Sequence, residues 1–160
     1  MKEKIIKVTI KPKPRVKVRV IGARDTAFEI KSKKKYPFML QNEVNVNVET
    51  TRRSFNVTIP KGYIWNGADI PKTLFWVGQS KDNNYLVASL VHDYLLEHKG
   101  YVFVDILKNE LSVKEYRRLT SLIFREILKD QDTNTIKANV MAWFVDSFQA
   151  TINKKQWKGL

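Results

Sequence analysis

The sequence predicts an α+β fold in a single compact domain of 160 residues. Up to Pro60, apolar and polar residues alternate with a period of two, which is typical of antiparallel strands and hairpins with one wet face. Beyond Pro60, apolar residues recur at helical spacing in about three segments. Strands followed by helices favour an α+β domain, and the length suits one hydrophobic core. We expect a basic β-rich part over residues 1–60, a loop and helical part over 61–150, and a basic tail over 151–160.

The predicted strands are short and separated by turn signals. They are IIKVTI (5–10), VKVRV (16–20), VNVNV (44–48) and FNVTI (55–59), with AFEIK (27–31) as a further candidate. The segment ETTRRS joins the third and fourth of these, so we expect a hairpin there. KPKPR carries two prolines, which cannot donate to a sheet and therefore mark a stiff connection or a sheet edge.

Three helices are predicted after the strands. The first runs from Asp82 or Asn83 to about His98, followed by Lys99-Gly100 as a terminator. The second follows the capping box formed by Ser112 and Glu115. Its apolar residues repeat at helical intervals: Tyr116, Leu119, Ile123 and Ile127. The third spans residues 134–149, and one stripe carries Ile136, Val140, Phe144 and Phe148.

The formal net charge of +13 is concentrated at the N-terminus, where the first 35 residues hold thirteen Lys or Arg and three acids. We expect a basic surface on the first strands that binds an acidic protein or, non-specifically, nucleic acid. Its candidate residues are Lys7, Lys11, Lys13, Arg15, Lys17 and Arg19. The alternative interpretation is a charged, solvated sheet edge that resists aggregation.

Composition excludes several classes of protein. The chain has no Cys, which removes disulfides, thiolate metal sites and Cys nucleophiles together. With only His92 and His98 as nitrogen ligands, a zinc site cannot be assembled, and we expect no metal and no cofactor. No apolar run reaches the ~18 residues of a membrane span, and the N-terminus is charged where a signal peptide is apolar. We therefore expect a protein that is not secreted.

The stretch SLVHDYLLEHKG places His92 and Asp93 in a helix that is otherwise mostly apolar. Burial of these groups requires partners, because an unpaired buried carboxylate is costly. The upstream segment GYIWNGADIPKTLFW supplies candidates: Asp69 as a third polar group, and Trp65, Gly67, Pro71 and Trp76 as structural loop residues. Two hypotheses follow: a network that holds the Trp65 to Pro71 loop against the helix, or a hydrolytic site formed by His92, Asp93 and Asp69.

Four blocks of the sequence also resemble a known family. They are GYIWNGADIPKTLFW, YLVASLVHDYLL, LSVKEYRRLTSLIFREIL and IKANVMAWFVDSF, from about Ile59 to Phe148. In this order they are similar to the bacteriophage- and prophage-associated domain of unknown function numbered thirteen fifty-three. The resemblance implies a phage origin and a shared fold. It also implies an acidic residue at the position of Ser121, so a His-Asp-Asp site of that kind would be degenerate here.

These observations favour a virion-associated or accessory interaction protein, with other phage proteins as partners, in the phage particle or the bacterial cytoplasm. The alternative is a small phage-encoded hydrolase. Trp143 and Trp157 have two interpretations, as contact anchors for a partner or as core residues with Trp157 folded back over Trp143.

Overall fold

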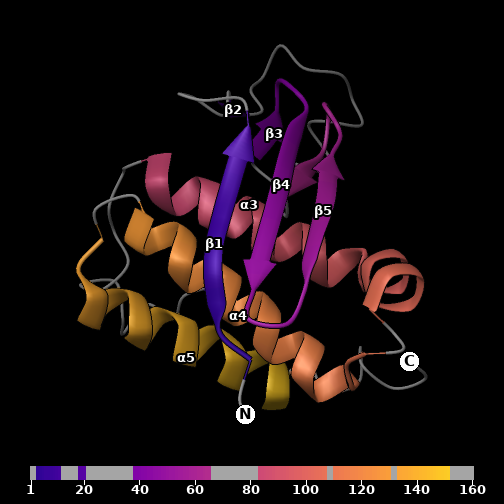
Figure 1. The fold of residues 1–160 in the computed structure, drawn as a ribbon. Helices are drawn as coiled ribbons and strands as arrows, with labels where there is room; N and C mark the ends of the chain where they lie inside the picture. The colour runs from indigo at the N-terminus through magenta and orange to yellow at the C-terminus, as the bar shows by residue number, and fades with distance from the viewer. Residues whose placement is uncertain are drawn as a thin grey trace.

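The computed structural model describes residues 3–11, 18–20, 38–65, 83–107, 110–130 and 133–151. Strands come first and helices follow, which confirms the predicted α+β class (Figure 1). The strands are β1 (Ile5–Lys11), β2 (Val18–Val20), β3 (Phe38–Leu40), β4 (Val44–Thr50), β5 (Ser54–Ile59) and β6 (Ile64–Trp65). The helices are α3 (Asn83–Glu97), the π-helix η2 (Gly100–Leu107), α4 (Val113–Asp130) and α5 (Thr135–Thr151).

The strands form two antiparallel sheets with the orders β1-β4-β5 and β2-β3-β6. β4 and β5 make the predicted hairpin, in which Glu49 lies opposite Ser54. The predicted first and second strands are present as β1 and β2, but they belong to different sheets. The candidate strand at 27–31 lies outside the described residues. β3 and β6 were not predicted, because segments this short show no periodicity.

The larger sheet has one buried face and one wet face. Residues alternate along β4, so that Val44, Val46 and Val48 are buried while Asn45 is exposed. On the wet face the polar side chains pair across the strands. Asn47 donates to Asn56 over 2.8 Å, and the Thr58 hydroxyl donates to Asn45 over 2.7 Å. The sheet therefore covers the helices with its valine face.

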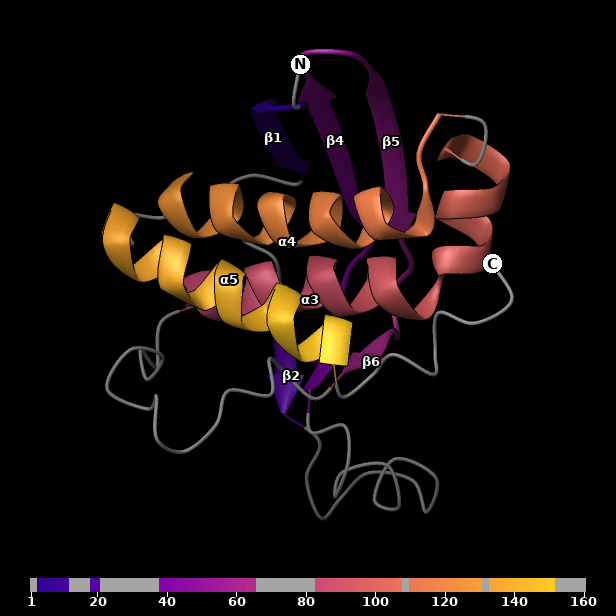
Figure 2. The same ribbon diagram turned by 90° about the horizontal axis from the view of Figure 1, so that it is seen from below.

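Helix α4 lies between the larger sheet on one side and α3 and α5 on the other (Figure 2). Contacts on both sides explain why its buried residues extend around much of the helix. They are Tyr116, Leu119, Thr120, Ser121, Ile123, Phe124, Ile127 and Leu128. The four predicted apolar positions are all in this set, which confirms the periodicity argument for this helix.

The capping box at the start of α4 is present. The backbone N–H and the hydroxyl of Ser112 donate to Glu115 Oε2 over 2.8 and 2.7 Å, and the Glu115 N–H donates to Ser112 Oγ over 3.3 Å. The hydrogen bonds from the Ser112 backbone and side chain lower the pKa of Glu115, and the nearby Arg52 and Arg53 lower it further. The Glu115 carboxylate therefore already accepts hydrogen bonds from donors within the protein.

Helix α3 ends at Glu97, close to the predicted end, but the chain then continues into η2. Gly100 is the first residue of η2 and not a terminator. The start of α3 at Asn83 matches one of the two predicted caps. Further along, the Tyr116 hydroxyl of α4 donates to the Leu95 carbonyl over 2.7 Å, which ties α4 to the last turn of α3.

The apolar stripe predicted for the third helix is not its buried face. In α5, Ile136 is 74% exposed and Val140 38% exposed, while Phe144 and Phe148 are partly buried. The buried residues are Ala138, Met141, Ala142, Val145 and Gln149. The physical reason is that a strict four-residue spacing drifts around the helix by about 120° over twelve residues, because a turn holds 3.6. Such a stripe begins in solvent and ends near the core.

Trp143 of α5 is 69% exposed, which contradicts the interpretation of this residue as core. Trp157 lies outside the described residues. None of the described helices has the length and apolar character needed to cross a bilayer, as the sequence predicted.

Replacing Ser112 by Ala should lower the free energy of unfolding by about 1 kcal/mol at neutral pH, since that is the usual cost of losing a serine cap. The pKa of Glu115 is lowered by folding, so its contribution is present above its unfolded pKa and lost as pH falls through its folded pKa. Urea unfolding should therefore show a smaller difference between variant and wild type in acid. Ser54→Ala, at an exposed serine, is the control. An equal difference at both pH values would contradict the role of the carboxylate.

Candidate functional site

His92 and Asp93 are consecutive residues of α3, so they lie in the same turn and point about 100° apart. His92 is 3% exposed, whereas Asp93 is only partly buried. Their side chains approach each other, with His92 Nδ1 3.5 Å from Asp93 Oδ1. Asp69, the predicted third polar group, lies outside the described residues together with Gly67, Pro71 and Trp76. The structure therefore brings together two of the three proposed catalytic groups.

The second ring nitrogen of His92 is buried and has no hydrogen-bond partner among the residues that the structure describes. The edge of the His92 ring packs against Phe124 of α4, with ring centroids 5.6 Å apart and planes at 65°. A buried nitrogen without a partner is rare and calls for an explanation, either structural or chemical. Gln149 Oε1 of α5 is a second buried atom without a partner among the described residues, so the feature is not specific to His92.

Ser89, one turn before His92, makes the described hydrogen bond between α3 and Trp65. The Trp65 indole N–H donates to Ser89 Oγ over 3.1 Å, and Ser89 Oγ donates to the Leu86 carbonyl over 2.9 Å. Both Trp65 and Ser89 are fully buried. The sequence predicts that His92 and Asp93 hold this segment, whereas at Trp65 the indole N–H donates to Ser89. The sequence places Ser89 on the same helical face as His92, but it gives no signal that Ser89 accepts a hydrogen bond from Trp65.

Ser121, at the position where the family resemblance implies an acid, is buried in α4. Its hydroxyl donates to the Arg117 carbonyl over 3.3 Å, and that carbonyl also accepts the Thr120 hydroxyl over 2.7 Å. Ser121 lies one turn before Phe124, the residue that contacts His92. Both hydroxyls thus find their hydrogen-bond acceptor within α4. As neutral groups, they place no charge beside His92.

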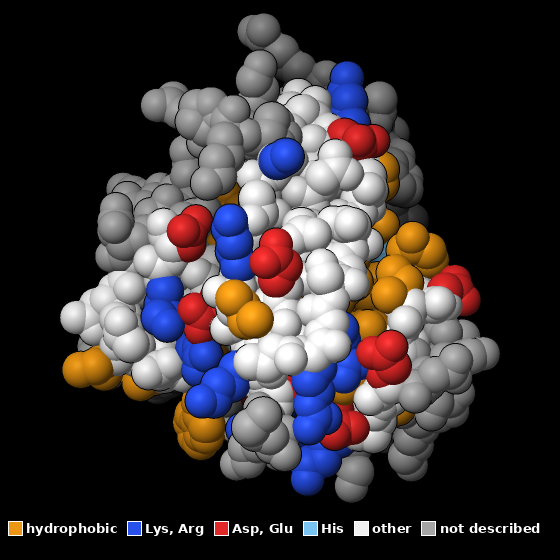
Figure 3. All heavy atoms as spheres, in the orientation of Figure 1, with side chains coloured by type: hydrophobic (Ala, Val, Ile, Leu, Met, Phe, Trp, Pro, Cys, Tyr) orange, Lys and Arg blue, Asp and Glu red, His pale blue; other side chains and the backbone are white. Residues whose placement is uncertain are grey.

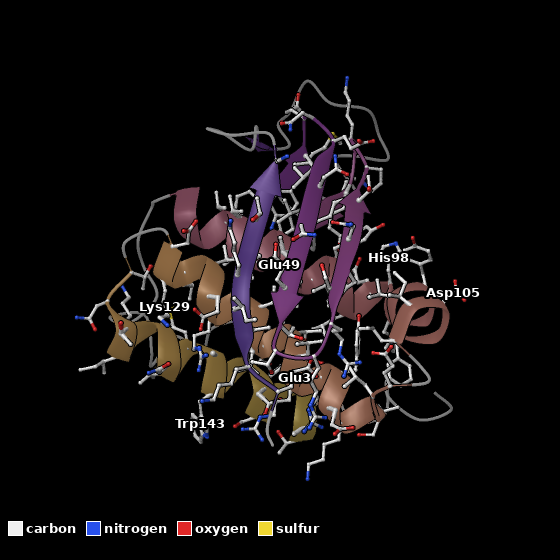
Figure 4. All side chains as sticks on the ribbon, viewed as in Figure 1. Glu3, Glu49, His98, Asp105, Lys129 and Trp143 are labelled. Atoms are coloured by element: carbon white, nitrogen blue, oxygen red, sulfur yellow. The ribbon has the colours of Figure 1, made fainter. Side chains whose placement is uncertain are left out.

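A cluster of aromatic rings at the C-terminal end of α3 was not predicted. Tyr63 meets Tyr94 edge-on at 5.1 Å, and Tyr94 stacks on His98 at 4.1 Å between centroids. The Tyr63 hydroxyl donates to Glu97 Oε2 over 2.8 Å. Burial, reinforced by Glu97, raises the pKa of Tyr63 far above its usual value, so this phenol is a permanent hydrogen-bond donor. Figure 4 shows His98 at this end of the helix, beside the sheet.

The predicted basic surface is only partly within the described residues. Lys7 and Lys11 are exposed on β1, as expected for the wet face of a sheet. Arg19 belongs to β2, in the other sheet, and its side chain is not described. Lys13, Arg15 and Lys17 lie outside the described residues. The described part places two of the six cations on one face, next to Glu49, which pairs with Lys7 in the β1–β4 register.

Among the described ranges, no three His, Cys, Asp or Glu side chains gather closely enough to hold a metal ion. In the described part of the chain, the ion pair at His92 is that of an imidazole with one neighbouring carboxylate, Asp93. Such a pair is able to exchange a proton, but it needs access to a substrate. In the described residues His92 faces packed side chains of α3 and α4.

Replacing Ser89 by Ala should lower the free energy of unfolding by about 1–3 kcal/mol, because the buried Trp65 N–H loses its acceptor. Denaturant unfolding measures this directly. Ser121→Ala is the matched control, since it removes an equally buried hydroxyl that is bonded only within its own helix. Equal losses of unfolding free energy in the two variants would mean that the Trp65–Ser89 hydrogen bond contributes no more than a hydrogen bond within one helix.

The comparisons with known proteins agree with the resemblance of the four sequence blocks. The sequence profile of one family, described as protein of unknown function (DUF1353), matches residues 39–145, well over half of the chain. No curated protein and no solved structure matches it. The matched range includes both strands of the β4–β5 hairpin, all of α3 and α4, and α5 up to Val145. The chain belongs to the DUF1353 family.

Proposed function

We propose that the chain is a virion-associated or assembly-accessory interaction protein of a bacteriophage, and that it binds its partner protein through an exposed face of α5. The observation that carries this proposal is the α5 stripe, which we define as Ile136, Val140 and Trp143. These residues follow one another at spacings of four and three, so they share one helical face. They are 74%, 38% and 69% exposed, and that face points away from the core.

An exposed stripe with this composition favours binding to another protein. Single exposed apolar residues are normal, but an adjacent Ile, Val and Trp on one helical face form a contiguous patch. Trp is enriched among the residues that contribute most to interface affinity, since it buries a large rigid ring. The apolar character of the stripe supports a protein partner better than a nucleic acid, whose backbone offers charge and not an apolar surface.

Charge supports a partner surface that is acidic around an apolar centre. The net charge of +13 is concentrated in the first 35 residues, so at α5 only the nearby cations count. Lys129, which is paired with Glu126, lies on the same side of the molecule as Trp143 in Figure 4, and Figure 3 shows Lys and Arg side chains beside the apolar ones there. Opposite charge would speed association and fix orientation, while the apolar stripe supplies contact energy.

Replacing Trp143 by Ala should reduce the copies of the chain per purified phage particle or assembly intermediate by at least about tenfold, the loss typical of an interface anchor. Quantitative mass spectrometry of the purified particles gives the copy number. Tyr101→Ala is the matched control, because Tyr101 is also an exposed aromatic, at 53%, but lies in η2. A wild-type chain that is absent from particles and intermediates, or that binds only DNA with a steep salt dependence, would contradict the proposal.

One observation favours the hydrolase alternative: the buried His92 nitrogen without a described partner. Imidazole is the commonest general base in proteins, and Asp93 is close enough to orient it. Against this stands the near-complete burial of His92 by side chains of the helix interface. We therefore assign His92 and Asp93 a structural role in the proposal.

Replacing His92 by Ala should lower the free energy of unfolding by about 1–3 kcal/mol, through lost packing on Phe124 and disturbed polar partners. The wild type should show no turnover of p-nitrophenyl acetate or p-nitrophenyl phosphate. His98→Ala, at the second histidine of the chain, is the control for both assays. Turnover that His92→Ala abolishes and His98→Ala retains, in a folded variant, would establish the hydrolase instead.

A further inference from the structure

A cavity of about 330 Å³ opens between the start of β1, the β4–β5 turn and the N-terminal half of α4. Its lining consists of Glu3, Arg52, Leu111, Glu115, Arg118, Leu119 and Leu122. Figure 4 places Glu3 at the lower end of the sheet, where Figure 3 shows Lys and Arg side chains gathered around acidic ones. Neither His92 nor the α5 stripe belongs to the lining. The volume is within the range of small-molecule sites.

The two carboxylates of the cavity already have donors within the protein. Glu3 Oε1 accepts the Thr50 hydroxyl over 2.6 Å and the Arg53 guanidinium over 2.8 Å. Glu115 Oε2 accepts both donors of Ser112, and its pKa is lowered accordingly. Each negative charge is thus neutralised or hydrogen-bonded by neighbours. A ligand cation would have to compete with these contacts.

The guanidinium of Arg118 is in a different situation. Arg118 is exposed at the cavity and forms no ion pair with any residue that the structure describes. Its chain neighbour Arg117 binds Asp146 of α5, with Nε 3.2 Å from Oδ1. The five N–H donors of the Arg118 guanidinium are therefore available to a group that is not among the described residues. A guanidinium binds carboxylate or phosphate oxygens in a two-point geometry.

The rest of the lining consists of Arg52, which takes part in another interaction, and of three leucines. Leu111 and Leu119 are buried beneath the cavity surface, and Leu122 is partly buried. Three leucines beside a free guanidinium match a molecule with an anionic head and a short apolar body. We propose that this cavity binds a small amphiphilic organic anion, with its carboxylate or phosphate on Arg118 and its aliphatic part on Leu111, Leu119 and Leu122. This site shares no residue with the α5 stripe, so the two proposals can be tested with separate variants.

Isothermal titration of the full chain with octanoate tests the proposal, with octylammonium as the probe of opposite charge and equal length. Octanoate should bind more tightly than octylammonium. Arg118→Ala should weaken octanoate binding by about tenfold, the usual effect of removing a charge-assisted hydrogen bond. Lys114→Ala is the matched control, because Lys114 is an exposed cation one turn earlier on α4 that does not line the cavity. It should leave the affinity unchanged.

The apolar half of the site has its own test. Leu122→Asp places a negative charge in the aliphatic part of the cavity and should also weaken octanoate binding, whereas Trp143→Ala in the α5 stripe should not. Three results would overturn the inference: no octanoate binding at millimolar concentration, equal losses for Arg118→Ala and Lys114→Ala, or tighter binding of octylammonium. The last would mean that Glu3 and Glu115 dominate the cavity.

Discussion

The burial of α4 on two sides is the constraint on which the rest of the structure depends. One side of the helix meets the valine face of the β1-β4-β5 sheet, and the other meets α3 and α5. Each neighbour is fixed by a separate contact. Tyr116 donates to the carbonyl of Leu95 in α3, and Arg117 binds Asp146 in α5. A helix in this position has little solvent-facing surface, so only a few of its residues are accessible to a ligand.

A helix packed in this way leaves polar groups in the interior, and most of them are satisfied locally. Thr120 and Ser121 return their hydrogen bonds to a carbonyl of their own helix, while Ser89 joins its helix to Trp65. These bonds add little net stability when made, but they are expensive to lose. His92 and Gln149 are exceptions, because one side-chain atom of each, Nε2 and Oε1, is buried without a partner in the described structure.

Periodic patterns allowed most of the fold to be predicted from the sequence, and the exceptions have physical causes. The β4–β5 hairpin and α4 follow from alternation and from a capping box, which are local signals. The buried face of α5 does not, because Ala138 and Ala142 are part of it while the larger Ile136 and Trp143 face solvent. Small residues pack against a neighbouring helix, and a pattern based on size and hydropathy places them poorly.

The site was harder to predict than the fold, because its contacts join residues that are distant in sequence. His92 and Asp93 are recognisable as polar residues in an apolar run. The Trp65 indole, however, donates to Ser89, and no sequence pattern connects these two residues. The cavity combines Glu3 with Arg118, and no local pattern connects these two positions.

Arg117 and Arg118 show how the fold divides similar residues between structure and binding. Consecutive residues on a helix point about 100° apart, so the packing of α4 turns one arginine toward α5 and leaves the other at the cavity. Arg117 forms an ion pair with Asp146, so its charge is neutralised within the protein. Arg118 has the same chemistry and no described partner. The excess positive charge of the chain thus becomes available for binding only where packing leaves a cation unpaired, and in the described residues the cavity beside α4 is such a place.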